Sequence, residues 1–292
     1  MMEAGCHSPW ISRWFQGQGW RVVVSNPRKV RAIYQHERKS DRRDALMLAR
    51  IGRMDPRLLY PVFHGTQEAQ EDLLRIKLRD SLVRARVALI NSVRFTLKSL
   101  GYAVRNPSSE RFHKVVMQEL PEALCRMIAP SVQAVAELSA RIKLLDREIS
   151  ALARTKYPQA ARLEQIPGVG PITALYFVLK IENPARFQNV RDVGAFAGLC
   201  PRRDQSGASD PQLRISKRGD AYLRRLLVSA AQYILGPFAP QSALRQYGLM
   251  LAADGTARAK KRAAVAVARK LAVLLLSLWK NQTQYQPFPH PA

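Results

Sequence analysis

The sequence is poor in acidic residues, in cysteine and in long apolar runs. Its 292 residues include 47 lysines and arginines but only 22 aspartates and glutamates, which gives a formal net charge of +25 at pH 7. A folded chain with this excess of positive charge predicts a polyanionic partner. Nucleic acid is the leading candidate, because each phosphate that a cation neutralises releases condensed counterions. An anionic membrane surface is the weaker alternative, since nothing else in the sequence is directed to lipid.

The few cysteines and histidines exclude several kinds of site. Cys6, Cys125 and Cys200 are widely separated and form no CxxC pair, so they cannot build a disulfide framework, and their odd number fits a reducing compartment. The five histidines are isolated from one another, and no cluster has the spacing of zinc ligands. The longest apolar run, residues 271–279, is too short to cross a bilayer, and the N-terminus lacks the pattern of a signal peptide. We therefore expect a cytoplasmic protein without a membrane partner.

Hydrophobic residues make up 47% of the chain and charged residues 24%, which is the composition of a folded protein. The pattern predicts an α/β part followed by a mainly α part. In the first part, residues 1–62, we expect a helix over residues 10–16 and a β-branched strand over residues 20–27 that ends in Asn-Pro. A second helix is expected from Ser40 to about Arg53, with Ser40 as its N-cap.

The second part, residues 63–160, is expected to consist of long helices. Residues 67–100 contain neither glycine nor proline and carry two apolar stripes, which indicates a helix packed on more than one side. Between residues 131 and 156 the apolar residues alternate in steps of three and four, as in a heptad: Val135, Leu138, Ile142, Leu145, Ile149 and Leu152. This pattern predicts a coiled-coil hairpin or a coil between subunits. A helix buried against its own domain fits almost equally well.

The third part, residues 161–286, is predicted to be helical and strongly basic, and residues 287–292 to be a disordered tail. Near its start, Gly168 and Gly170 lie in IPGVGPITA. A turn of small residues between two helices lets backbone N–H groups approach a phosphate, as in a helix-hairpin-helix unit. A plain tight turn is the alternative interpretation.

Residues 201–227 place a serine among many cations. Ser206 and Gly207 lie in a polar loop, and a serine hydroxyl can attack a phosphodiester where clustered guanidinium groups offset the charge of the transition state. Residues 258–270 form a second basic run without an acid. The predicted nucleic-acid contacts, besides Gly168 and Gly170, are Arg202, Arg203, Arg214, Lys217, Arg218, Arg224, Arg225, Lys260, Lys261 and Arg262. The alternative interpretation of residues 201–227 is a loop that only contacts phosphate, and that of residues 258–270 is a solvated helix face.

Two acids of the first part are candidates for a metal site. Asp41 and Asp44 lie three residues apart at a predicted helix start, so both project from the same face. Their oxygens would suit a divalent cation. On spacing alone, however, aspartates in a first helical turn are ordinary capping residues.

Several strings together resemble one family. Glu3-Ala4-Gly5, VVVSNP and SDRRDALMLAR are followed by IPGVGPITA, by VGAFAGLCPRRDQSG at residues 193–207 and by RISKRGDAYLRRLLV at residues 214–228. In this order they resemble transposases of insertion-sequence family 110, the DEDD transposases that act as RNA-guided recombinases. The resemblance extends from Glu3 to about Tyr285.

The resemblance implies a partial RuvC-like (RNase H-like) domain, coiled-coil helices for assembly and a helical C-terminal transposase domain. It implies that Glu3, Asp41 and Asp44 match the second, third and fourth acids that hold Mg²⁺, and that Ser206 is the nucleophile that becomes linked to DNA. The implied partners are donor and target DNA, a structured guide RNA, and further copies of the chain in a dimer or tetramer.

The sequence departs from the family pattern at its start. The first acid of the family lies on an opening strand upstream of Glu3, whereas this sequence begins two residues before Glu3. Either the true start lies upstream, or this is a decayed or truncated copy. Without the N-terminal part of the metal domain, we expect the chain to be inactive or nearly so. Two other interpretations remain: an inactive remnant that only binds nucleic acid, and a nuclease that acts through metal alone and leaves Ser206 without a role.

Overall fold

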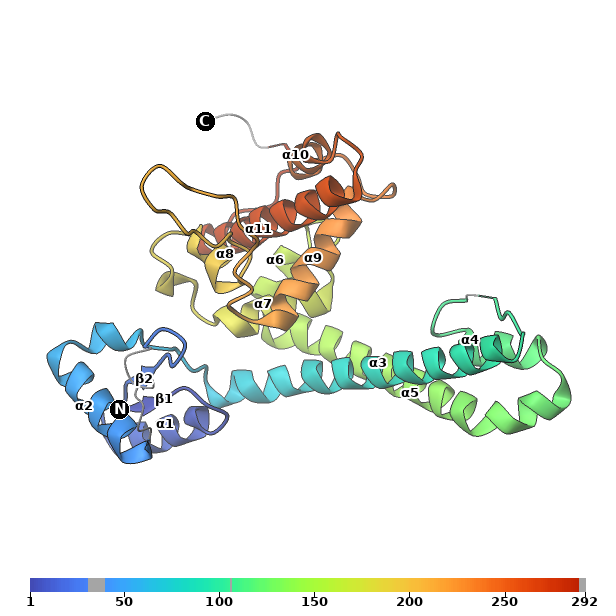
Figure 1. The fold of residues 1–292 in the computed structure, drawn as a ribbon, viewed down its shortest axis with the longest axis horizontal. Coiled ribbons are helices and arrows are strands. Elements are labelled where there is room, and N and C mark those ends of the chain that lie inside the picture. Colours follow the sequence, from blue (N-terminus) through green and yellow to red (C-terminus); the bar gives the residue numbers. More distant parts are fainter. Residues whose placement is uncertain (31–39, 106, 289–292) are drawn as a thin grey trace. The chain divides into compact units, whose positions relative to one another are not determined.

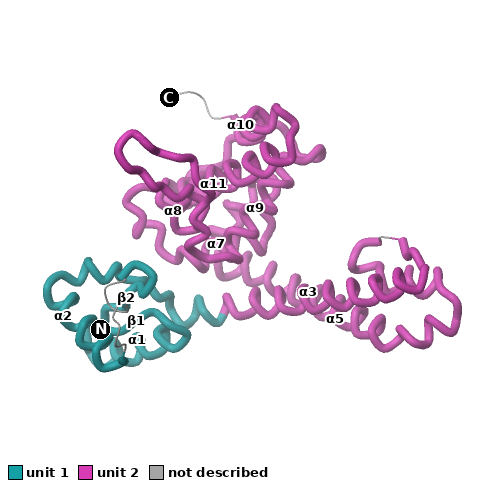
Figure 2. The backbone as a smooth tube through the Cα atoms, viewed as in Figure 1, with its two compact units in different colours: residues 1–71 teal, residues 72–292 magenta. Residues whose placement is uncertain are grey.

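The computed structural model of the chain describes residues 1–30, 40–105 and 107–288. The chain divides into two compact units, residues 1–71 and residues 72–292, which Figure 2 colours separately. Helices dominate, and the regular sheet within the described residues has two strands. The expectation of a small α/β part followed by a mainly α part is therefore confirmed at this level, while the RuvC-like and helix-hairpin-helix assignments stay predictions.

The sheet of the first unit is short and parallel. β1 (Met2–Glu3) pairs with β2 (Val24–Ser25). On the other edge of β2, the backbone N–H of Val62 donates to the carbonyl of Val24 at 2.8 Å. The strand predicted over residues 20–27 is thus regular at two residues only. A β-branched run favours extended backbone, but the length of a strand also depends on the neighbours that pair with it.

The helices of the first unit begin close to the predicted residues. α1 (Ser8–Gly17) precedes β2, and α2 (Asp41–Met54) leads into the 3₁₀ helix η2 (Pro56–Leu59). The Ser40 side chain accepts a hydrogen bond from the backbone N–H of Arg43 at 3.4 Å, which confirms the predicted N-cap. A small core of Val30, Leu48 and Leu59 lies beneath these elements.

Two long antiparallel helices form an arm (Figure 1). α3 (Gln67–Ser99) has nearly the predicted bounds, whereas α5 (Glu122–Lys156) begins before the predicted residue 131 and passes through Pro130. Polar contacts fix their register: Arg79 with Asp146 at 2.8 Å, Arg86 with Ser139 at 3.2 Å, and Lys156 with Asp72 at 2.6 Å. At the far end of the arm, α4 (Phe112–Val115) and the 3₁₀ helix η3 (Val116–Gln118) complete a buried cluster.

The heptad positions of α5 divide into two rows. Val135, Ile142 and Ile149 are buried, whereas Leu138, Leu145 and Leu152 are half-buried. Since α3 and α5 belong to one chain, this packing corresponds to the predicted hairpin. A coil between subunits stays a prediction, and the half-buried row is the part of α5 open to it.

The rest of the second unit is a helical body built around α11. Its elements are α6 (Pro158–Leu163), α7 (Pro171–Ile181), η4 (Pro184–Arg186), α8 (Asp192–Phe196), α9 (Ala221–Leu235), α10 (Ala243–Leu251) and α11 (Ala257–Asn281). α11 packs against α8, α9 and α10. Its buried face is rich in alanine, which lets neighbouring helices approach closely. Arg245 of α10 is also buried, and its guanidinium donates to the carbonyls of Ile234 and Gly236 at the end of α9.

The chain end returns to the helical body. The backbone N–H of Tyr285 donates to the Gln165 side chain at 3.0 Å, and the carbonyl of Pro287 accepts from the N–H of Ala243 at 2.9 Å. The disordered tail predicted from residue 287 is therefore wrong at Pro287, and residues 289–292 lie outside the described residues. Within the described ranges, no helix is both long and apolar enough to cross a bilayer.

Candidate nucleic-acid interface and serine hairpin

Ser206 lies near the end of an exposed hairpin. The hairpin spans residues 199–217 and projects from the helical body beside α8 (Figure 1). Two antiparallel bridges hold its arms together, Pro201 with Ile215 and Ser206 with Ser209. The backbone N–H of each of these two serines donates to the carbonyl of the other at 3.0 Å. Both serines are exposed, so their hydroxyls are open to a large substrate.

The base of the hairpin is tightly fixed. Gly219 has a φ of +144°, and a Cβ at this position would lie 2.2 Å from the carbonyl oxygen of Phe196. Arg224 of α9 donates to the carbonyls of Ala197 and Lys217 at 3.1 and 3.3 Å, which joins the two arms at their base. The orientation of the hairpin on the body is therefore set by backbone contacts that leave no room for a side chain.

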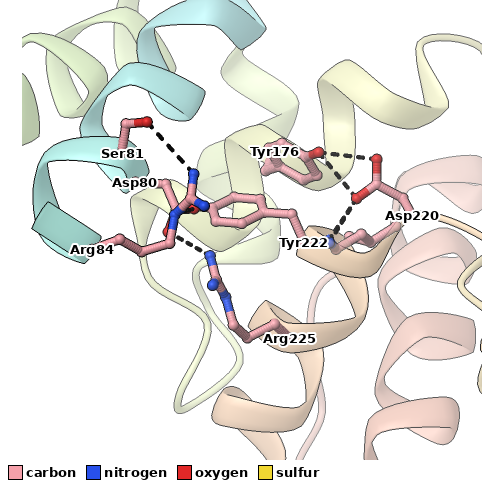
Figure 3. Close-up of polar contacts among 8 residues, drawn as sticks. Asp80, Ser81, Arg84, Tyr176, Asp220, Tyr222 and Arg225 are labelled. Atoms are coloured by element: carbon pink, nitrogen blue, oxygen red, sulfur yellow. Dashed lines mark hydrogen bonds and ion pairs between the residues drawn. The ribbon is translucent and has the colours of Figure 1, made fainter. Parts of the chain in front are cut away.

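Asp220 anchors the chain where the hairpin ends and α9 begins. Its carboxylate accepts hydrogen bonds from the Tyr176 hydroxyl and the Tyr222 N–H (Figure 3) and from the Leu223 N–H. It also pairs with Lys180 at 3.1 Å. Burial by itself raises the pKa of the Asp220 carboxyl, but the Leu223 N–H, Lys180 and Tyr176 outweigh it and hold that pKa below its ordinary value. Burial also raises the pKa of the Tyr176 hydroxyl, and Asp220 adds to this effect.

We expect Asp220→Asn to remove part of the acid sensitivity of folding. Because the pKa of Asp220 is lower in the folded state, the ionised carboxylate stabilises the protein above the unfolded pKa of about 3.9. This contribution is lost as the pH falls through the folded pKa. The variant should be less stable by roughly 1–3 kcal/mol at neutral pH, and the difference should shrink in acid.

Urea unfolding at neutral pH and near pH 3 measures this difference. Asp210→Asn is the matched control, because the ion pair that Asp210 forms among the described residues, with Arg203 at 3.1 Å, is exposed and contributes little to stability. If Asp220→Asn loses the same stability at both pH values, the lowered pKa of Asp220 in the folded state is contradicted.

Two predicted nucleic-acid contacts are engaged inside the protein. Arg224 holds the hairpin base, and Arg225 forms an ion pair with Asp80 of α3 (Figure 3). Asp80 also pairs with Arg84 at 3.2 Å, and the Arg225 guanidinium lies 4.7 Å from the centre of the Tyr222 ring. These contacts connect the arm to α9. They give both arginines a structural role, and their binding of nucleic acid stays a prediction.

A basic groove lies between the hairpin base, α10 and α11. It has a volume of about 1650 Å³, and residues 285–287 border it as well. Its lining contains no acid but eight cations: Arg191, Arg214, Lys217, Arg258, Lys261, Arg262, Arg269 and Lys270. All eight are exposed, and within the described ranges none of them forms an ion pair. Eight uncompensated charges around one groove favour a polyanionic ligand.

The groove includes four of the predicted contacts and adds four more. Arg214, Lys217, Lys261 and Arg262 line it, whereas Arg202, Arg203, Arg218 and Lys260 are exposed elsewhere. Arg258, Arg269 and Lys270 belong to the predicted basic run 258–270 but were not among its individually named contacts, and Arg191 lies outside both basic runs. Helical periodicity contained the signal for three of them, because positions 258, 261, 262, 265, 266, 269 and 270 share one face of α11.

The small-residue turn before α7 has a packing role. Gly168 has a φ of +88°, and a Cβ there would lie 2.9 Å from the Tyr233 ring and 3.0 Å from the carbonyl oxygen of Ala230, both on α9. Gly168 thus lets α9 approach the turn. Gly170 is exposed, and nothing lies near the position of its Cβ. Phosphate binding by this turn stays a prediction, and Gly168 is explained without it.

The three predicted metal ligands lie in the first unit. Glu3 is exposed on β1, and Asp41 and Asp44 lie in the first turn of α2 behind the Ser40 cap. Carboxylates are suitable donors for Mg²⁺. However, the described residues bring no three His, Cys, Asp or Glu side chains into a group that could hold a metal ion. The donor chemistry therefore fits a cation, while the arrangement of the described residues does not gather the ligands.

Comparison with known proteins gives concordant matches. A family model described as "Transposase IS116/IS110/IS902 family" matches residues 160–247, and a second, of DEDD transposases, matches residues 1–101. A "Transposase for insertion sequence element IS1111A" of Coxiella burnetii is 32% identical over 98% of the chain and 79% of that protein. A "Probable family 20 transposase" of Pseudomonas aeruginosa is 30% identical over 98% of the chain and 85% of that protein. A "Transposase for insertion sequence element IS1328" of Yersinia enterocolitica is 31% identical over 79% of the chain and 69% of that protein.

Proposed function

Because the chain belongs to the IS116/IS110/IS902 transposase family, we propose that it cuts and rejoins DNA strands with the Ser206 hydroxyl as its nucleophile. The observation that carries this proposal is an exposed serine near the end of a hairpin whose base borders the basic groove. A nucleophile for duplex or branched DNA has to reach a phosphodiester without obstruction, and the hairpin offers that access.

The proposed step is a transesterification. The Ser206 oxygen attacks the phosphorus, a P–O bond to the serine forms, and the P–O bond to one sugar oxygen breaks. The serine proton is released, and the departing sugar oxygen takes up a proton. The phosphodiester energy is kept in the serine linkage, so a sugar hydroxyl can reverse the step and rejoin a strand. Arg202, Arg214 and Lys217 are the cations that we assign to the developing phosphate charge.

The acids of the first unit are proposed to bind a divalent cation. Glu3, Asp41 and Asp44 would hold Mg²⁺, which would supply charge neutralisation at a phosphate. Support comes from the donor chemistry and from the DEDD transposase match over residues 1–101. The described residues do not bring these ligands together.

Two further partners are proposed from the resemblance and from charge. A structured guide RNA would suit a chain of net charge +25, since RNA phosphates release counterions as DNA phosphates do.

Self-association as a dimer or tetramer would use the half-buried row Leu138, Leu145 and Leu152 of α5, because a second helix can cover such a row.

The test is formation of a covalent adduct. Protein expressed from its complete reading frame is incubated with end-labelled DNA, Mg²⁺ and the RNA of its own element, and the products are separated on a denaturing gel. A labelled band at the size of the protein is expected. Binding of DNA without any adduct would instead support a remnant that only binds nucleic acid, and strand cleavage without an adduct would support metal-only hydrolysis.

A further inference from the structure

Apolar side chains that are mostly half-buried also line the basic groove, whereas its cations are exposed, and we call these apolar side chains its apolar floor. α11 contributes Val265, Ala266, Val273 and Leu274, and α10 contributes Leu244 and Leu251. Tyr247 also lines the groove, and the Lys270 ammonium lies 3.7 Å from the centre of its ring. The groove therefore combines two kinds of surface, positively charged side chains and apolar side chains.

Duplex DNA matches only the first of these two kinds of surface. The outside of a duplex presents phosphates and sugars, and its base faces are stacked inside. An apolar floor against a phosphate backbone would be left with poor contacts and would desolvate charge. A single strand can turn its base faces to carbon and aromatic surfaces while its phosphates reach the cations.

The size of the groove agrees with a chain-like ligand. Pockets for single small molecules measure roughly 300–1,000 Å³, whereas this groove measures about 1650 Å³ and is bordered by the hairpin base, α10, α11 and residues 285–287. Eight cations in a lining without an acid are also more than one small anion needs. Several consecutive nucleotides would use both the length and the charge.

We infer that the groove binds an unpaired stretch of nucleic acid, with its phosphates on the cations and its bases on the apolar floor. This inference rests on the proposed function, because it takes the ligand to be a nucleic acid. Pro201 and residues 212–215 of the hairpin form one wall of the groove. A strand bound there would therefore run beside the base of the hairpin that carries Ser206.

The test uses two neighbouring lysines of α11. Lys261 lines the groove and Lys260 does not, although both are exposed and belong to the same basic run. Binding of a labelled single-stranded oligonucleotide of about 12 nucleotides is followed by fluorescence anisotropy. Lys261→Glu should weaken binding about tenfold, and Lys260→Glu less than about threefold. Equal losses in the two variants would overturn the assignment to the groove.

A second variant tests the apolar floor. Ala266→Glu places a carboxylate where the bases are expected, so it should weaken binding of the single strand about tenfold and that of a duplex of equal length far less. The logarithm of wild-type affinity for the single strand should fall with the logarithm of salt concentration at about −0.7 per phosphate contacted. Thermal unfolding of each variant checks that it is folded.

The outcomes separate this inference from the proposed function. If the wild-type protein binds the duplex at least as tightly, and Ala266→Glu weakens both ligands equally, the groove is a duplex site and the inference is wrong while the proposed function stands. If the wild-type protein binds neither ligand, the proposed function itself fails.

Discussion

In protein expressed from its complete reading frame, Ser206→Ala is expected to abolish covalent protein–DNA adducts and to leave DNA affinity nearly unchanged. The substitution removes one hydroxyl from an exposed hairpin and none of the cations that line the groove. Loss of a nucleophile lowers the rate of such a step by roughly a thousandfold or more. The measurement is the fraction of end-labelled DNA that migrates with the protein on a denaturing gel, with affinity followed in parallel.

Ser209→Ala is the matched control for this experiment. Ser209 lies opposite Ser206 in the same bridge, is equally exposed and exchanges the same backbone hydrogen bonds. Its substitution should leave adduct formation close to the wild-type level. Adducts that persist in Ser206→Ala and disappear in Ser209→Ala would assign the nucleophile to Ser209.

Gly219→Ala is expected to destabilise the second unit severely. Gly219 has a φ of +144°, a backbone conformation that residues with a side chain rarely adopt. The added Cβ would also lie 2.2 Å from the Phe196 carbonyl oxygen. Backbone strain and overpacking together cost roughly 3–5 kcal/mol. The melting temperature should fall by about 10 °C, and adduct formation should fall with it because the hairpin base would shift.

Gly170→Ala provides the comparison for this substitution. Gly170 has a negative φ, is exposed and has nothing within 4 Å of its Cβ position. Its melting temperature should remain within about 2 °C of the wild type, because a surface substitution of this kind changes stability little. If Gly219→Ala were equally stable, the backbone contacts at the hairpin base would not fix its orientation.

Local signals predicted the main helices of residues 1–160. Residues 67–100 lack glycine and proline, so little opposes a long helix, and α3 has almost those bounds. Ser40 can cap only the helix that follows it, and it does. The strand at residues 20–27 was less predictable, because its regular part is limited to the two residues that pair with β1. The start of α5 was also missed, because Pro130 reads as a helix boundary although the helix passes through it.

The candidate site was predicted as residue types but not as an arrangement. The basic runs include Arg214 and Lys261, which line the groove, yet Arg191 lies far from both in the sequence and reaches the groove only through the fold. The same limit applies to Gly168, whose tight neighbours are on α9. Sequence alone also could not show that Asp80 on α3 forms an ion pair with Arg225, because this pair depends on how the arm packs against α9.

The unpaired cations of the groove link stability to ligand binding. Eight like charges around one groove repel one another in the free protein, and a bound polyanion removes that repulsion. If a polyanion binds the groove as inferred, it raises the stability of the folded state by mass action, and the charges that repel one another in the free protein are the ones that stabilise the complex. A substitution that relieves this repulsion would make the empty protein more stable and the complex weaker. Selection for activity thus opposes selection for a stable free protein along this face of α11.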